Sequence, residues 1–185
     1  MKLCMFSPVE MDLERGWPGR IDGDTVIQLA AQTLQSFFTG GGDAREHAVY
    51  PIADVVFRAP VLHPPSVRIF DSFKEFRFAN PAAIVGGGSK PELPEGAPEL
   101  VPRRFDAAII GADGEIGGFT EFVEWTVPEW PGEKSRDFAL ALGPIVTTLE
   151  KGDSWPGKWE FEEWFHMVWH AGLNTRLYPG DLIAA

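Results

Sequence analysis

Lys134 is the side chain best placed for chemistry when the sequence is considered alone. It lies in the glycine-flanked segment 132–138, just before a predicted strand, and catalytic groups are often mounted on loops that a rigid scaffold positions. A lysine there could polarise a substrate carbonyl or stabilise an enolate. The alternative is an ordinary exposed lysine of a surface loop.

Two histidines are four residues apart, at His166 and His170, and would share one face of a helix. Glu162 and Glu163 precede them by about one turn, and two imidazoles with a carboxylate could hold zinc. The glutamate that directly follows the first histidine in a zincin motif is missing. The pattern therefore favours a solvated polar helix face over a metal site.

Other motifs for nucleophilic or phosphate chemistry do not occur. Cys4 is the only cysteine, which excludes an intrachain disulfide, and its place in a predicted first strand indicates a buried, inert thiol. No Gly-x-Ser-x-Gly sequence is present. The glycine runs 40–42 and 86–88 lack the lysine of a phosphate loop, so we expect turns.

Length and charge bound the class of protein. The chain has 185 residues, 44% of them hydrophobic, and a formal net charge of −11, which fits one globular domain. The acidic balance argues against nucleic acid and against anionic membrane surfaces as partners, since both need a basic face. No apolar run is long enough for a secretory signal or a membrane span. We expect a cytoplasmic location.

The elements that must position these residues divide the chain in two. Residues 1–60 read as a small N-terminal α+β cap, with a strand at 2–6, a hairpin at 20–29, a helix at 29–38 and an extended segment at 49–61. The Asp22-Gly23 pair predicts the tight turn of that hairpin.

Residues 61–185 read as a rolled, mixed β core, so the fold class is α+β and mostly β. A helix is expected at 161–170 and a strand, turn and strand at 177–183. Further strands are expected at 75–78, 83–85, 105–111, 118–125 and 144–148.

Four tryptophans gather in one C-terminal stretch, at Trp155, Trp159, Trp164 and Trp169. Large aromatic side chains dominate burial in cores and interfaces. The stretch therefore predicts a core or a subunit interface, and an aromatic ligand pocket is the alternative.

Short motifs in a fixed order resemble the fumarylacetoacetate hydrolase (FAH) family. They lie at 59–68, at Phe78-Ala-Asn-Pro-Ala-Ala-Ile-Val-Gly86, and at 108–111, 118–120, 134–144 and 179–183. The resemblance implies a FAH-like β-roll core, commonly a homodimer, acting on small molecules. It also implies a divalent metal ion held by four carboxylates, with cleavage or isomerisation of the carbon framework of oxo acids.

The residues at the family's metal positions are mostly not carboxylates here. Ile69 stands where the first metal aspartate would be, Arg103 and Phe105 stand for the Glu-x-Glu pair, and Glu124 alone keeps an acid. The loop that carries the family's general-base histidine is missing between Phe70 and Lys74. Magnesium and calcium need several oxygen ligands, so we expect no metal cofactor.

The resemblance therefore implies a site that keeps only some of the family's functional residues. Glu124, Lys134 and Arg103 are the expected catalytic residues. The substrate-binding residues are expected to be Ile69, Phe78, Phe105 and Asp137.

Three functions fit this site. The first is a metal-independent enzyme that isomerises, cyclises or decarboxylates a β-dicarbonyl or polyketide-like compound, with Arg103 or Lys134 stabilising an enolate and Glu124 as acid or base. The second is a non-catalytic binding protein on the same fold. The third is a metal-dependent hydrolase whose ligands come from elsewhere, for example from Asp71 and Glu121.

Overall fold

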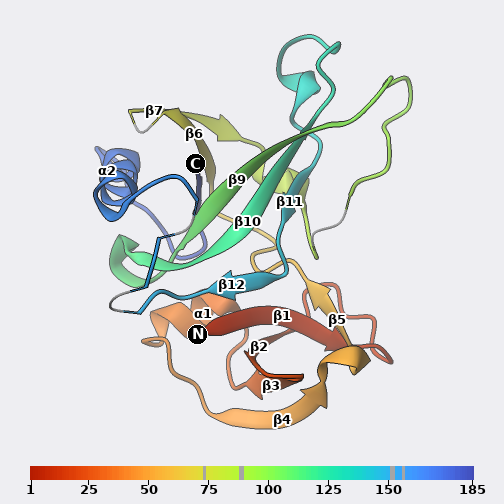
Figure 1. Ribbon diagram of the computed structural model, residues 1–185, viewed down its shortest axis with the longest axis vertical. Coiled ribbons are helices and arrows are strands. Elements are labelled where there is room, and N and C mark those ends of the chain that lie inside the picture. Colours follow the sequence, from red (N-terminus) through yellow and green to blue (C-terminus); the bar gives the residue numbers. More distant parts are fainter. Residues whose placement is uncertain (73, 88–89, 151–152, 156) are drawn as a thin grey trace.

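The N-terminal strands form an antiparallel layer at the bottom of the molecule (Figure 1). The computed structural model describes residues 1–72, 74–87, 90–150, 153–155 and 157–185. The predicted hairpin is present, but its two turn residues are Gly23 and Asp24, one position later than the predicted Asp22-Gly23 pair, because Asp22 pairs with Thr25. The strands of this layer are β1 (Lys2–Pro8), β2 (Trp17–Asp22), β3 (Thr25–Leu29), β4 (Glu46–Pro51) and β5 (Val55–Arg58).

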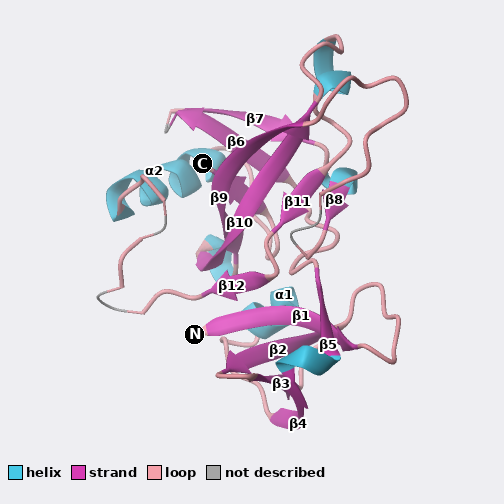
Figure 2. Cartoon of the chain, turned by 45° about the vertical axis from the view of Figure 1, so that its right-hand side comes forward, coloured by secondary structure: helices cyan, strands magenta, loops and turns pink. Residues whose placement is uncertain are grey.

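The remaining strands surround a long antiparallel hairpin, formed by β9 (Val101–Ile110) and β10 (Ile116–Thr126). Figure 2 shows this hairpin rising from the N-terminal layer, which connects to it through the pairing of β1 with β12. The other strands are β6 (Val67–Ser72), β7 (Glu75–Ala79), β8 (Ile84–Val85), β11 (Leu140–Leu142), β12 (Ile145–Thr147) and β13 (Leu182–Ala184).

The sheet is mixed. Strand β13 pairs in parallel with β6 and antiparallel with β9, and β8 pairs in parallel with β11. Strands therefore outweigh helices, and the predicted α+β, mostly β class is confirmed.

The first helix begins later than predicted. Strand β3 continues to Leu29, which pairs with Glu46 of β4, so the helix α1 (Leu34–Thr39) starts only after this ladder ends. Thr33 caps it, because its hydroxyl oxygen accepts a hydrogen bond from the Ser36 N–H at 3.0 Å. The second helix, α2 (Phe161–Gly172), agrees with the prediction and runs two residues further. It lies at the edge of the molecule, beside β6 and β7 (Figure 1).

The segment 177–183 contains one strand rather than two. Asp181 bends the chain before β13, since its carboxylate accepts a hydrogen bond from the Tyr178 N–H at 2.7 Å. The same carboxylate accepts one from the Ser66 hydroxyl at 2.6 Å and faces Arg68 at 3.8 Å. Both Arg68 and Asp181 are buried. These contacts of Asp181 join the motif blocks at 59–68 and 179–183.

The main hydrophobic core is shared by both parts of the chain. Leu3 and Leu34 from the first 60 residues pack in the same cluster as Ile69, Ile109 and Leu182. A second cluster lies under α2 and contains Phe70, Phe119 and Trp164. The division at residue 60 stays a prediction.

No helix among the described residues is long and apolar enough to cross a membrane.

Candidate functional site

Strand pairing brings Arg103 and Glu124 together. In the β9–β10 ladder these two residues are direct partners, so their side chains point to the same face. Phe105 follows two residues after Arg103 and shares that face. Its ring lies 5.3 Å from the Arg103 guanidinium carbon and packs edge-on against Phe122. Three of the predicted site residues therefore do lie side by side.

The neighbouring β6–β7 hairpin adds two charged residues to this face. Arg77 is the ladder partner of Ile69, and Asp71 follows two residues after Ile69 on β6. Arg77 donates a hydrogen bond from Nη2 to Glu124 Oε2 at 2.5 Å. Its Nε lies 3.6 Å from Asp71 Oδ2, which is an ion-pair distance. Arg77 was not predicted from the sequence.

The result is a four-residue charge cluster of Asp71, Arg77, Arg103 and Glu124. Arg103 bridges the two acids, donating from Nη1 to Glu124 Oε2 at 3.2 Å and from Nη2 to Asp71 Oδ1 at 2.6 Å. Two carboxylates thus face two guanidinium groups. The cluster is neutral in formal charge.

The cluster is buried at one end and open at the other. Glu124 is 0% exposed, whereas the side chain of Asp71 is 54% exposed. Glu124 Oε1 and Arg77 Nη1 are buried and have no hydrogen-bond partner among the described residues. Unpaired buried polar atoms are costly, so the inner end of the cluster has unused hydrogen-bonding capacity.

The donor set does not fit a divalent cation. Magnesium and calcium take several oxygen ligands, but Glu124 Oε2 already accepts from two guanidinium groups and Asp71 faces the same two. Unit charges 4 Å apart interact by about 4 kcal/mol at an effective dielectric constant of about 20, and here the arginines would repel the ion. No group of three or more His, Cys, Asp or Glu side chains in the described part of the chain could hold a metal ion.

Two predicted lining residues do not present an exposed side chain to this cluster. Ile69 is fully buried in the main core, so it packs inside the protein instead of lining a cleft. Phe78 follows Arg77 on β7 and therefore points to the opposite face of that strand. Its ring lies 5.3 Å from the guanidinium carbon of Arg68 and meets the Phe76 ring on the side of α2.

Lys134 lies on an exposed loop beside this region. Its ammonium group is paired with Asp137 at 2.6 Å, and it is 78% exposed. The Asp137 carbonyl accepts a hydrogen bond from the side chain of Asn80 at 3.0 Å, which ties the loop to the end of β7. Lys134 and Asp137 thus form a pair of their own, three residues apart in sequence.

The other face of the β9–β10 hairpin carries a second pair of acids, Asp106 and Glu121, which are direct ladder partners. Glu121 therefore points away from Glu124, and the metal site considered with Asp71 and Glu121 is not assembled. Burial raises the pKa of the Asp106 carboxyl, and the facing Glu121 carboxylate raises it further.

Asp106→Asn is expected to stabilise the protein at neutral pH. An unfolded aspartate ionises near pH 3.9, so above this value the unfolded chain releases its proton first and stability falls until the folded carboxyl has also ionised. The gain should vanish in acid, where both forms are protonated. Urea unfolding of both proteins from acid to neutral pH measures this, with Glu99→Gln in an exposed loop as the control. An equal gain at every pH would contradict the assignment.

Cys4, His166 and His170 do not form a second candidate catalytic site. Burial raises the pKa of the Cys4 thiol to about 12, which agrees with an inert side chain. The His166 and His170 rings stack with centroids 6.2 Å apart, and His170 meets the Phe76 ring at 5.8 Å. Both imidazole rings are half-buried against aromatic neighbours, while Glu162 on the same face of the helix is exposed.

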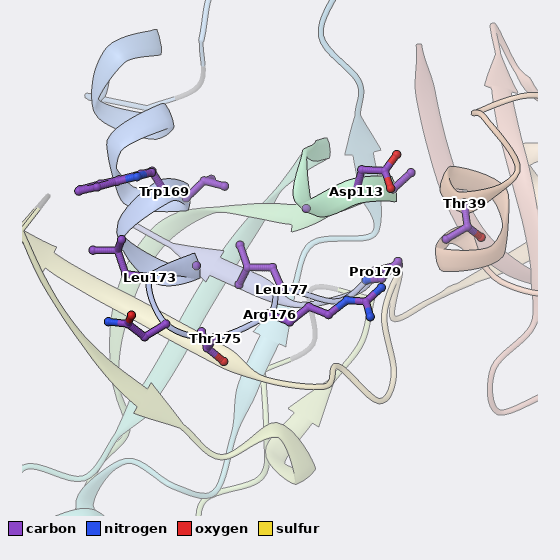
Figure 3. A pocket seen from close by; sticks show the side chains of 13 residues that line it. Thr39, Asp113, Trp169, Leu173, Thr175, Arg176, Leu177 and Pro179 are labelled. Carbon is purple, nitrogen blue, oxygen red and sulfur yellow. The ribbon is translucent and has the colours of Figure 1, made fainter.

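A cavity of about 810 Å³ lies at the C-terminal end of α2, away from the charge cluster. Figure 3 shows Trp169 and Leu173 on one side of it, with Asp113 and Thr39 on the other. Asp113 comes from the turn between β9 and β10, and Thr39 from α1. No predicted site residue lines this cavity.

No protein-family model matches the sequence, and no curated protein matches it significantly. Solved structures do match its fold. Maleylpyruvate hydrolase from Sphingobium sp. SYK-6, in complex with manganese(II) and pyruvate, has a TM-score of 0.75 at 20% identity, over 100% of this chain and 87% of that chain. A 5-carboxymethyl-2-hydroxymuconate delta-isomerase from Mycobacterium smegmatis has a TM-score of 0.68 at 18% identity, with the same coverage.

A 2-keto-3-deoxy-D-arabinonate dehydratase complexed with magnesium and 2,5-dioxopentanoate has a TM-score of 0.68 at 15% identity, over 100% of this chain and 86% of that chain. These enzymes differ in reaction but share one fold. The fold that the sequence motifs predicted is therefore confirmed.

Proposed function

Given that the chain has the fold of the fumarylacetoacetate hydrolase superfamily, we propose that it is a metal-independent enzyme acting on a small oxo acid or β-dicarbonyl compound. The reaction class is isomerisation, cyclisation or decarboxylation through an enolate. The observation that carries the proposal is the convergence of Arg77 and Arg103 on one oxygen of Glu124. We place the protein in the cytoplasm.

Two arginines can replace a cation in this chemistry. An enolate carries its negative charge on oxygen, and fixed donors aimed at that oxygen stabilise the transition state. Guanidinium groups are always charged and present several N–H donors in a rigid plane. Arg103 is the more accessible of the two, so we assign it the substrate oxygen.

Glu124 is the proposed acid or base. As a carboxylate it can take a proton from the carbon next to the substrate carbonyl and later return a proton to the product carbon. Phe105 would then pack against the carbon chain of the substrate. Lys134 and Asp137 would close the rim of the site.

Asp71 controls access in this scheme. Its exposed carboxylate occupies the outer side of Arg103, where the carboxylate of an oxo acid would bind. The ligand must therefore displace Asp71. We expect Asp71→Asn to bind anionic ligands more tightly than the wild type.

The test uses metal-free protein with pyruvate and acetoacetate, followed by NMR in D₂O. Exchange of the pyruvate methyl protons, or release of acetone from acetoacetate, is expected without added metal. Arg103→Met should lower either rate by on the order of 10²-fold, the usual cost of losing an oxyanion donor. Lys134→Ala should also lower it, and Glu121→Gln, on the opposite face, is the matched control.

Turnover that appears only with added manganese or magnesium would refute metal independence. Unchanged turnover in both Arg103→Met and Lys134→Ala would contradict the roles proposed for these two residues.

A non-catalytic binding protein is the second candidate. It is favoured by the complete burial of Glu124 and by the pairing of every charge in the cluster. Binding of pyruvate that Asp71→Asn strengthens, with no exchange or decarboxylation in any variant, would support this candidate instead.

A further inference from the structure

The cavity at the C-terminal end of α2 is built from three segments that lie far apart in the sequence. The end of α1 supplies Thr39, the turn between β9 and β10 supplies Asp113 and Gly114, and the segment after α2 supplies Arg176. Its volume of about 810 Å³ falls within the range of small-molecule sites, roughly 300–1,000 Å³. No residue of the charge cluster lines it, so it is separate from the proposed active site.

Two opposite charges at this cavity are unpaired. The carboxylate of Asp113 and the guanidinium group of Arg176 form no hydrogen bond or ion pair with each other or with any other described residue. Arg176 lies over the ring of Tyr178, with its guanidinium carbon 5.1 Å from the ring centroid, and this contact leaves its N–H donors free to bind an anion. Both charged side chains are exposed, so a ligand can reach them.

The backbone beside these charges adopts an uncommon conformation. Asp113 has a φ of 54° and Asn174 a φ of 58°, and they are the two non-glycine residues with positive φ in the described part of the chain. Both line this cavity. Positive φ is uncommon outside glycine, and residues held there cluster at ligand sites. The backbone therefore points to the same place as the unpaired charges.

Apolar side chains form the wall that faces the acid. Figure 3 shows Trp169 and Leu173 on the side of α2, across the cavity from Asp113. Both are exposed, although they are large and apolar. A pocket with an apolar wall and a few polar groups opposite it is the usual form of a small-molecule site. The cavity therefore suits a ligand with one charged end and one apolar end.

A second hollow extends the apolar side. It has a volume of about 360 Å³ and is lined by aromatic rings that include Phe161 and Phe165. Val168 and Gly114 line both hollows. A Cβ atom at Gly114 would have only the Leu177 Cβ nearby, at 4.0 Å, so a side chain there would project into the junction. Glycine at this position keeps the two hollows connected.

The charges select a ligand that carries both signs. A plain carboxylate would meet Asp113 as well as Arg176, and a plain amine would meet the same two groups with the opposite result. The net charge of −11 also repels free anions, whereas a zwitterion has no net charge. An α-amino acid carries its ammonium and carboxylate groups on the carbon that bears its side chain. The aromatic rings of the second hollow favour an aromatic side chain.

We propose that this cavity binds a free aromatic α-amino acid. Its carboxylate pairs with Arg176 and its ammonium group with Asp113. Its ring lies against Trp169 and Val168 and points towards the second hollow. This binding site is separate from the proposed enzymatic function and does not depend on it.

Calorimetric titration with L-phenylalanine and three analogues tests the ligand class. N-acetylphenylalanine lacks the ammonium group, as the last residue of a peptide does, and phenylalaninamide lacks the carboxylate, as the first residue does. Each is expected to bind on the order of tenfold more weakly than phenylalanine, because one charged hydrogen-bonding partner is lost. L-alanine, which lacks the ring, should also bind more weakly. Equal binding of either blocked analogue would indicate a peptide terminus and overturn the proposal.

Two variants test the assigned contacts. Arg176→Met should weaken phenylalanine by on the order of tenfold and leave phenylalaninamide unchanged, since the amide has no carboxylate to pair. Asp113→Asn should weaken phenylalanine and leave N-acetylphenylalanine unchanged, and asparagine tolerates the positive φ at this position. The matched controls are Arg15→Met and Asp24→Asn, at exposed residues that do not line the cavity.

A further variant separates this site from the proposed active site. Arg103→Met should bind phenylalanine as the wild type does, because Arg103 does not line this cavity. Loss of binding in Arg103→Met would place the amino acid at the charge cluster and overturn the proposal. So would a wild type that does not bind phenylalanine, or unchanged binding in both Arg176→Met and Asp113→Asn. Calorimetry reports binding without turnover, so a failed activity assay leaves this result unaffected.

Discussion

Replacing Glu124 with leucine is expected to lower the free energy of unfolding by about 3–5 kcal/mol, the usual cost of breaking a buried ion pair. Arg77 would lose the oxygen that accepts its Nη2–H and Arg103 would lose one of its two acids. The charge of Arg77 would then remain largely buried, with the more exposed Asp71, 3.6 Å from its Nε, as its one remaining acid in the cluster. Urea unfolding at neutral pH measures the loss.

Glu121→Leu is the matched control for this substitution. It lies three residues away on the same strand but on the exposed face, and exposed substitutions usually change stability by less than about 0.5 kcal/mol. Adding Arg77→Met to Glu124→Leu should restore most of the loss, because apolar groups can replace a buried ion pair at little cost. A Glu124→Leu protein as stable as the wild type would show that the cluster does not anchor the two hairpins.

Trp164→Ala is expected to cost about 3–5 kcal/mol in unfolding free energy, as other large-to-small changes of buried aromatic residues do. Trp164 is 0% exposed and its ring meets Phe119 edge-on at 4.9 Å. The small side chain would leave a cavity between α2 and the β9–β10 hairpin. Thermal or urea unfolding of dilute protein measures the effect.

Trp169→Ala is the comparison for Trp164→Ala. It removes the same side chain from the same helix, but Trp169 is 52% exposed, so we expect a loss of less than about 1 kcal/mol in the monomer. Equal losses at the two positions would contradict the burial of one face of α2.

Local signals in the sequence predicted much of the fold. The hairpin turn near Gly23 and the apolar spacing of 161–170 depend on neighbouring residues; the helix occurs where expected and the turn lies one residue later. The helix expected from Leu29 starts late because Leu29 pairs with Glu46, which lies 17 residues further along the chain. Helical spacing cannot reveal such a partner. Pairing between distant segments decided that boundary.

The prediction of the site was limited in the same way, by contacts between distant segments. The family resemblance predicted Arg103, Phe105 and Glu124 as parts of one site, and they do lie together because one hairpin register places all three. Arg77 was missed because its contact with Glu124 depends on how the β6–β7 hairpin lies against β9 and β10. In the sequence, Arg77 stands out only as a charged residue between Phe76 and Phe78 in a predicted strand. The same alternation places Phe78 on the opposite face.

The neutral charge cluster also constrains how such a site can change by mutation. Replacing Arg103 alone with a carboxylate would leave three acids around Arg77, and the guanidinium group of Arg77 would still face any cation. Removing Arg77 alone would leave Glu124 buried with only Arg103 as a partner. Each single step therefore passes through an unbalanced intermediate. Conversion between an arginine-based site and a metal-based site requires coupled substitutions on two hairpins.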